Sequence, residues 1–267
     1  MNEFILHQRL RGFALAVLSY KKNFEEYIPA IAPGCTFHLD RHKNGAYYHG
    51  VVIDGKAGTI EPVFRGTDGD NVIGQAQAWF TNARILTGPD GIINGCQEVV
   101  EDFLKKYGCY FKDAKTSHGK GHSQGSMCAK INALRVAEEY SNIDLSTFET
   151  YADFPAGDQR FEDRCAIQHE AGRLYGTYTN LRGDPAGSDR LRNKNNPLLD
   201  GVNTGTQNMI ADVLGPHADS ALGLFGHSPR AYCFAKMWDE VKKIELGLPV
   251  DNHYLQSISW ILWRLKN

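Results

Sequence analysis

Several features that mark membrane, secreted and nucleic-acid-binding proteins are missing from the 267-residue sequence. No run of about eighteen apolar residues is present, which argues against a membrane-spanning helix. Residues 1–11 carry scattered charges where a secretory signal needs an apolar stretch, so we expect no signal peptide. The formal net charge is only −2. We therefore expect no nucleic-acid partner and at most transient contact with a lipid surface.

The six cysteines lack the spacing of a metal site or of a compact disulfide framework. They lie far apart in the sequence and include no C-x-x-C pair. In a chain of this size such cysteines are typical of free thiols in a reducing compartment, so we expect a cytoplasmic protein. The composition leaves the oligomeric state open.

Apolar periodicity predicts alternating helices and strands in one domain, residues 1–267. This alternation favours an α/β fold with a mostly parallel central sheet and helices on both faces. Residues 184–226, rich in Gly, Asn, Asp and Pro at their start, are expected to be a long loop region with a functional role. Helices are predicted at 4–20 (amphipathic), 96–107 (ending at Gly108), 126–140, 159–172 and 228–246, strands at 46–53, 59–65, 112–120, 147–152 and 173–181, and an apolar segment at 254–265.

The strand predicted at residues 112–120 has an unusual composition. It runs Lys-Asp-Ala-Lys-Thr-Ser-His-Gly-Lys. A central strand of a parallel sheet is normally buried on both faces and apolar. This polar run is the feature that fits an α/β fold least well.

Directly after that run comes Gly121-His122-Ser123-Gln124-Gly125, a G-x-S-x-G pattern. The pattern is typical of a serine nucleophile on a sharp turn from a strand into a helix, where side chains two positions away would collide. Such a turn places the backbone N–H of Gln124 at a helix N-terminus, where it can stabilise an oxyanion. On its own, the same pattern also fits an ordinary glycine-rich turn.

Three stretches in order resemble those of class 3 lipases, a family that includes fungal lipases and phage-type bacterial esterases. They are Val63-Phe64-Arg65-Gly66-Thr67, the G-x-S-x-G segment, and residues 150–158, in which Asp153 and Phe154 depart from the usual order. The likeness covers roughly residues 45–230. It implies an α/β-hydrolase fold with Ser123 as nucleophile.

The resemblance also implies a catalytic aspartate and then a histidine, in that chain order. Asp184, in Asp184-Pro185 after the strand at 173–181, is the acid that position favours, with Asp158 and Asp189 as rivals. An Asp-Pro pair also commonly begins a simple turn. His227, before the helix at 228–246, is the expected base, and His217 is its closest rival. His253 is a further candidate by order alone.

The family's oxyanion hole implies backbone N–H donors from Thr67 and Gln124, with Arg65 holding the loop. His122 is expected to point into the fold, because adjacent residues on a turn cannot easily face each other. The four-residue spacing of His118 and His122 could suggest zinc, but the glycines between them argue against a helical metal site, and we expect none. Trp79, Phe80 and Ile85 fit a core role better than a lid.

Taken together, these patterns predict a serine carboxylic-ester hydrolase that needs no cofactor and acts on a small ester or a lipid. The lack of a long amphipathic lid helix favours an esterase slightly over a triacylglycerol lipase. An acyltransferase, thioesterase or phospholipase would use the same apparatus. A degenerate hydrolase serving as a binding module is the alternative from another class, and the polar run before Ser123 is what supports it.

Overall fold

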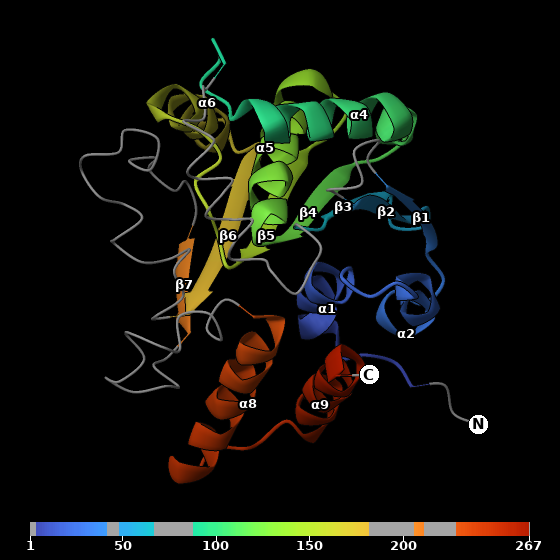
Figure 1. The fold of residues 1–267 in the computed structure, drawn as a ribbon, viewed down its shortest axis with the longest axis vertical. Coiled ribbons are helices and arrows are strands. Elements are labelled where there is room, and N and C mark those ends of the chain that lie inside the picture. Colours follow the sequence, from blue (N-terminus) through green and yellow to red (C-terminus); the bar gives the residue numbers. More distant parts are fainter. Residues whose placement is uncertain (1–3, 42–47, 67–87, 182–205, 211–227, 267) are drawn as a thin grey trace.

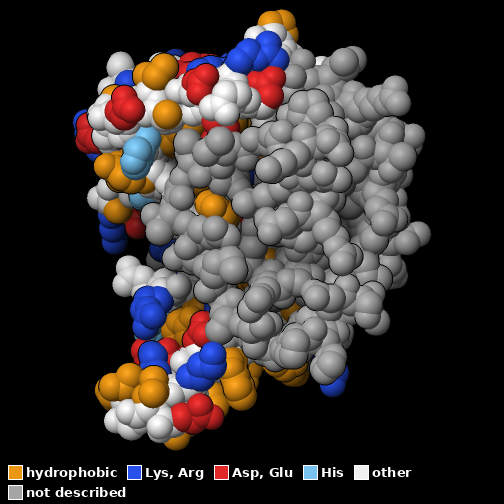
Figure 2. Space-filling view, turned by 90° about the vertical axis from the view of Figure 1, so that its left-hand side faces the viewer, with side chains coloured by type: hydrophobic (Ala, Val, Ile, Leu, Met, Phe, Trp, Pro, Cys, Tyr) orange, Lys and Arg blue, Asp and Glu red, His pale blue; other side chains and the backbone are white. Residues whose placement is uncertain are grey.

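The computed structural model describes residues 4–41, 48–66, 88–181, 206–210 and 228–266, and the remaining residues are grey in Figure 1 and Figure 2. A seven-stranded sheet crosses the molecule, and the spatial order of its strands follows the sequence (Figure 1). The first three strands pair antiparallel, and the remaining pairs are parallel, as predicted. The strands are β1 (Thr36–Arg41), β2 (Tyr48–Asp54), β3 (Thr59–Phe64), β4 (Thr116–His122), β5 (Leu145–Tyr151), β6 (Leu174–Leu181) and β7 (Thr206–Ile210).

Helices cover both faces of the sheet, also as predicted (Figure 1). On one face α5 contacts the three central strands β3, β4 and β5, and α4 and α6 lie beside it. On the other face α1 contacts the same strands, and the α8–α9 pair packs beyond it. The helices are α1 (Arg11–Leu18), α2 (Ile28–Ile31), α4 (Asn94–Phe111), α5 (Gln124–Glu139), α6 (Gln159–Glu170), α8 (Pro229–Glu245) and α9 (Asn252–Lys266), with 3-10 turns η1 (Gln8–Leu10) and η2 (Phe24–Tyr27).

The sequence predicts free thiols at the cysteines and argues against membrane-spanning helices. All six cysteines lie within the described residues and carry free thiols, as predicted. Across the described ranges, no helix is both long enough and apolar enough to span a membrane.

The predicted hairpin before the F-R-G segment is confirmed. β2 and β3 pair antiparallel, with Asp54 opposite Thr59. The Asp54 carboxylate accepts hydrogen bonds from the backbone N–H groups of Lys56 (3.1 Å) and Ala57 (3.0 Å), which closes the turn. β3 therefore delivers Arg65 and Gly66 to the end of the sheet where β4 also terminates.

The N-terminal helix differs from its prediction. α1 begins only at Arg11, and every residue from Gly12 to Leu18 is buried. The helix is therefore not amphipathic in its surroundings, because the sheet covers one side and α2 and α9 contact the other. Apolar periodicity predicts an amphipathic helix only where one side of the helix faces solvent, and α1 has no such side.

Other elements also differ from their predictions. α4 continues past Gly108 to Phe111, and a Cβ atom at Gly108 would come 2.7 Å from the Tyr140 hydroxyl, so this glycine makes room for packing instead of ending the helix. β1 is an edge strand that the sequence did not predict. β7 lies inside the region expected to be a loop.

The central strand β4 begins at Thr116, four residues after the predicted start, and continues to His122, so only the second part of the polar run belongs to it. Its two faces meet different neighbours. Ser117 and Gly119 are buried toward α5, where a Cβ atom at Gly119 would lie 3.2 Å from the Ala129 carbonyl oxygen. His118 and Lys120, on the α1 side, are half-buried and paired with β5: His118 Nδ1 lies 2.7 Å from Thr147 Oγ1. The strand is polar because one face admits a close helix and the other carries hydrogen-bonded polar groups.

A buried ion pair joins α5 to the chain leaving β5. Lys130 Nζ lies 2.8 Å from an Asp153 carboxylate oxygen, and their side chains are 4% and 0% exposed. The other Asp153 oxygen accepts a hydrogen bond from Thr150 Oγ1 at 2.7 Å. Asp153, one of the departures from the family pattern, is therefore used inside the core. A buried carboxylate that loses its cation is strongly destabilising.

We expect Lys130→Met to lower the free energy of unfolding by about 3–5 kcal/mol, because the Asp153 carboxylate would remain buried without its lysine. Urea denaturation measures the change. Lys112→Met, at an exposed position, is the matched control and should change stability by no more than about 0.5 kcal/mol. Adding Asp153→Asn to Lys130→Met should restore part of the loss. Equal stability of Lys130→Met and Lys112→Met would contradict a structural role for this pair.

Candidate active site

Ser123 occupies a strained turn between β4 and α5. Its backbone angles are φ 58° and ψ −130°, and among the described residues only one other non-glycine residue, Ala152, has a positive φ. A non-glycine residue in such a conformation costs about 1–3 kcal/mol and persists only where the surroundings enforce it. This is the backbone geometry that the G-x-S-x-G pattern predicts for a nucleophile turn, although the Ser123 side chain is buried here.

The glycines on either side of the turn are required by close backbone packing. A Cβ atom at Gly121 would overlap the carbonyl oxygen of Gly125, and one at Gly125 would overlap the carbonyl oxygen of Phe64. The end of β4, the first turn of α5 and the end of β3 thus lie in direct backbone contact. The motif is a steric requirement of this site, as the sequence predicts.

Backbone hydrogen bonds hold the turn to its neighbours. The N–H of Ser123 donates to the Tyr151 carbonyl at 3.0 Å, and its carbonyl accepts from the N–H of Ser126 at 2.9 Å. The Ala152 N–H in turn donates to the Tyr232 hydroxyl of α8 at 2.9 Å. β5 and α8 therefore fix the place of Ser123 from the side opposite β3.

The first residues of α5 present the positive end of the helix to this turn. Ser123 is the N-cap residue, yet its side chain makes no capping hydrogen bond to the helix. Gln124 is the first helical residue, and the N–H groups of a first helical turn have no partner inside the helix. A negative charge that develops beside Ser123 would be stabilised by these N–H groups and by the helix dipole.

The segment after β3 lies against the nucleophile. A Cβ atom at Gly66 would be 3.1 Å from Ser123 Cβ and 3.0 Å from the His122 carbonyl oxygen. Gly66 therefore brings the chain to the serine immediately before Thr67, the predicted second oxyanion donor. Thr67 itself lies outside the described residues.

A tyrosine that the motif analysis missed also reaches this turn. Tyr20 Oη lies 3.0 Å from His122 Nδ1 and 3.2 Å from the His122 carbonyl oxygen. The Arg65 guanidinium lies over the Tyr20 ring, 5.1 Å from its centroid. His122 is buried, as predicted, and is engaged by Tyr20. No local pattern indicates Tyr20, because it comes from the residues following α1, about a hundred positions earlier.

The predicted acid and base lie beyond what the structure describes. Asp184 and His227, with the rivals Asp189 and His217, fall outside the described residues, as do the candidate lid residues Trp79, Phe80 and Ile85. The elements that bracket the predicted pair are described, however. β6 ends at Leu181 and α8 begins at Pro229, so the expected order of strand, aspartate, histidine and helix fits these boundaries.

Two rival residues are described, and both have other partners. Asp158 caps α6 by accepting the N–H of Arg160 at 2.9 Å, and the two side chains form an ion pair. His253 Nε2 lies 2.9 Å from the Ile5 carbonyl oxygen and its ring packs beside His7. Within the described part of the chain, no cluster of three or more His, Cys, Asp or Glu side chains is arranged to hold a metal ion.

The sheet, its helices and the turn at Ser123 make this an α/β-hydrolase fold. The solved structures most similar in fold include fungal lipases. Lipase II from Rhizopus niveus has 13% identity and a TM-score of 0.57, covering 76% of this chain and 79% of its own. The Rhizopus microsporus var. chinensis lipase has 13% identity and a TM-score of 0.55, covering 78% and 77%. The Rhizomucor miehei triacylglyceride lipase has 16% identity and a TM-score of 0.53, covering 76% and 78%.

These neighbours confirm the resemblance to class 3 lipases at the level of the fold. No protein-family model and no curated protein matches the sequence. Identities of 13–16% carry no activity from one chain to another. The chemistry must therefore be argued from the site itself.

The strain at Ser123 leads to a prediction that needs no substrate. Ser123→Gly and Ser123→Ala both remove the hydroxyl, but only glycine accepts a φ of 58° without cost. We expect the glycine variant to be the more stable by about 1–2 kcal/mol in urea denaturation. At an ordinary helical position such as Ala133 of α5, the order reverses, and Ala133→Gly should destabilise. If Ser123→Ala proved as stable as Ser123→Gly, the turn would not be strained.

Proposed function

We propose that this protein is a serine carboxylic-ester hydrolase that works through an acyl-enzyme. The observation that carries the proposal is the strained backbone of Ser123, held between β4 and α5 by close-packed glycines. Backbone strain of this kind is concentrated at functional sites. At a turn without a function, a single substitution of the strained residue by glycine would remove the strain. The fold shared with fungal lipases supports the same reading.

The proposed reaction begins with attack by Ser123 Oγ on the acyl carbonyl carbon. His227 accepts the hydroxyl proton, and Asp184 orients the imidazole and stabilises its charged form. The carbonyl oxygen becomes an oxyanion that the backbone N–H groups of Gln124 and Thr67 bind. Collapse of this intermediate breaks the ester C–O bond, and His227 returns the proton to the leaving alcohol.

Deacylation repeats these steps with water. His227 removes a proton from a water molecule as it attacks the acyl-enzyme, and then protonates Ser123 Oγ as the acid product departs. The scheme needs no cofactor. A related chemistry is described for one structural neighbour with a TM-score of 0.53, a triacylglycerol lipase whose catalytic centre is a serine protease triad. An acyltransferase or thioesterase would use the same steps with another acceptor or leaving group.

The described residues do not favour the binding-module alternative. That alternative rested on the polar run before Ser123, and residues 116–120 of this run belong to a regular strand in register with β3 and β5. A serine that no longer reacted would gain stability from a relaxed turn, as the preceding argument shows. The ester-hydrolase proposal accounts for both features.

Hydrolysis of p-nitrophenyl esters from acetate to palmitate tests the nucleophile. We expect Ser123→Ala to lower kcat/KM at least about a thousandfold, because no acyl-enzyme can form without the hydroxyl. Ser141→Ala, at an exposed serine, is the matched control and should retain full activity. A fluorophosphonate should label the wild type and Ser141→Ala but not Ser123→Ala. If both ester hydrolysis and labelling were absent from the wild type, the binding-module alternative would replace this proposal.

Comparison of two histidine variants tests the base. His227→Ala should reduce kcat to nearly the level of Ser123→Ala, and combining the two substitutions should cause little further loss, because the residues act as one unit. His217→Ala should lie within about threefold of wild type. If the two histidine variants exchanged these results, His217 would be the base and the rest of the mechanism would stand.

A further inference from the structure

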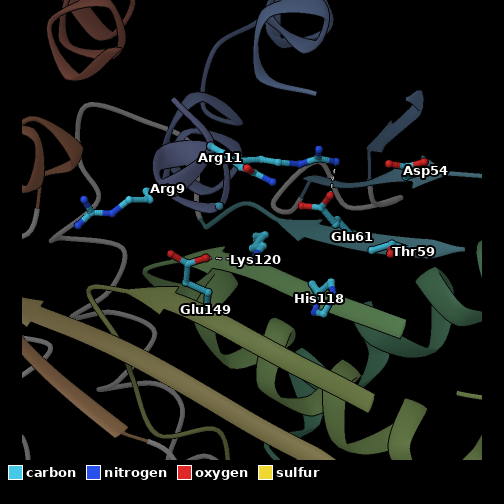
Figure 3. A pocket seen from close by; sticks show the side chains of 10 residues that line it. Arg9, Arg11, Asp54, Thr59, Glu61, His118, Lys120 and Glu149 are labelled. Carbon is cyan, nitrogen blue, oxygen red and sulfur yellow. Dashed lines mark hydrogen bonds and ion pairs between the residues drawn. The ribbon is translucent and has the colours of Figure 1, made fainter. Parts of the chain in front are cut away.

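A polar cavity of about 400 Å³ lies between the first turn of α1 and the central strands, on the sheet face opposite α5 (Figure 3). Its size is that of a small-molecule site. Its lining includes the polar side chains of Gln8, Arg11, Glu61, His118, Lys120 and Glu149. The strand that leads to Ser123 thus contributes His118 and Lys120 to the floor of this cavity.

Two ion pairs line the cavity, one between β4 and β5 and the other between α1 and β3. On one side Lys120 Nζ lies 2.9 Å from a Glu149 carboxylate oxygen, and the other Glu149 oxygen accepts the Tyr151 hydroxyl. On the other side Arg11 pairs with Glu61 of β3. Figure 3 shows the two pairs on either side of the cavity, with His118 near its floor.

The site is close-fitting on the helix side. A Cβ atom at Gly12 would overlap a Glu149 carboxylate oxygen and come 3.0 Å from Lys120 Nζ. The first turn of α1 therefore lies directly over this ion pair because residue 12 has no side chain. Helix and sheet thus meet closely at this edge of the cavity, which is open to solvent on its outer side.

The charges of the cavity wall balance. Burial, together with the charges of Lys120 and Arg11, lowers the pKa of His118 to about 4, so its imidazole is neutral at pH 7. The wall then holds three cations and three carboxylates: Arg9, Arg11 and Lys120, and Asp54, Glu61 and Glu149. A charged ligand would be repelled by as many charges of the cavity wall as would attract it. The wall therefore suits a neutral ligand.

The same groups have hydrogen-bonding capacity to spare. An ammonium group has three donors, of which Lys120 uses one for Glu149, and each carboxylate has about four acceptor sites. Gln8 adds an exposed amide at the rim. Donors and acceptors thus alternate around the cavity, as a ligand with several hydroxyl groups requires.

A purely structural role explains these residues poorly. Strands at the centre of a parallel sheet are normally apolar on both faces. Buried or half-buried ion pairs are often no more stabilising than apolar side chains of the same volume, because burial removes their hydration. Polar side chains on three adjacent strands, facing one cavity, are better explained by a ligand.

We propose that this cavity binds a small, neutral, polyhydroxylated molecule, a polyol or a monosaccharide. The hydroxyl groups would donate to Glu61 and Glu149 and accept from Arg11 and Lys120 without disturbing either ion pair. The site is distinct from the ester-hydrolysis machinery: it lies beside α1 and does not include Ser123. The proposal therefore stands or falls independently of the proposed function.

Amide chemical shifts of the ¹⁵N-labelled full chain test the site, with glycerol, myo-inositol and D-glucose as probes up to about 100 mM, a range that detects millimolar dissociation constants. At least one probe should cause saturable shifts at Gly12, Glu61 and Lys120. Ser123→Ala should show the same shifts. Inorganic phosphate and glycine should cause none there. Saturable binding of phosphate or glycine instead, or no saturable response to any of the three polyols, would overturn the proposal.

Two variants localise the effect. Lys120→Gln should weaken binding about tenfold, because it removes a charged hydrogen-bond donor from the wall. Lys105→Gln, at an exposed position of α4, is its matched control and should bind as the wild type does. If thermal melting shows that Lys120→Gln is unfolded, Gln8→Ala at the exposed rim takes its place. We expect Gln8→Ala to weaken binding of the polyol about threefold. Unchanged affinity in the folded variant would contradict binding in this cavity.

Discussion

The close approach of three backbone segments at Ser123 is the constraint on which the rest of the structure depends. β3, β4 and the first turn of α5 can meet only if residues 121 and 125 lack side chains, and the serine between them must then take a positive φ. The cost of that conformation is offset by the sheet pairing and helix packing around it. The parallel order of β3, β4 and β5 places the ends of three strands at one edge, where α5 begins.

The other face of the sheet is arranged around α1. Because this short helix is buried on every side, its sequence is apolar almost throughout, and α9 supplies the outer cover that solvent would otherwise provide. The residues that follow α1 return to the nucleophile turn, where Tyr20 contacts His122. Gln8 and Arg9, which precede it, and Arg11, its first residue, line the polar cavity. One helix thus connects the surroundings of Ser123 with those of the ion pairs.

The parts of the fold that the sequence predicted correctly depend on short-range rules. The steric need for Gly121 and Gly125, the turn at Asp54 and the periodicity of α4, α5 and α6 can each be read within a few residues. The errors have distant causes. Gly108 was read as a helix end, but its role is set by Tyr140, thirty-two positions later, and the contacts of Tyr20 lie across the sheet. Such pairings have no signature in a single sequence.

The polar strand shows why composition alone can mislead about a site. Read along the chain, β4 argues against a catalytic α/β fold, since its charges conflict with burial on both faces. Read in the structure, its residues separate by alternation. Small side chains face α5 and allow the helix to approach closely enough to form the turn, while His118 and Lys120 face α1 and pair with β5. The small face is a condition for the strained serine. The charged face takes no part in forming the turn at Ser123. His118 and Lys120 can therefore serve a second role on the same strand.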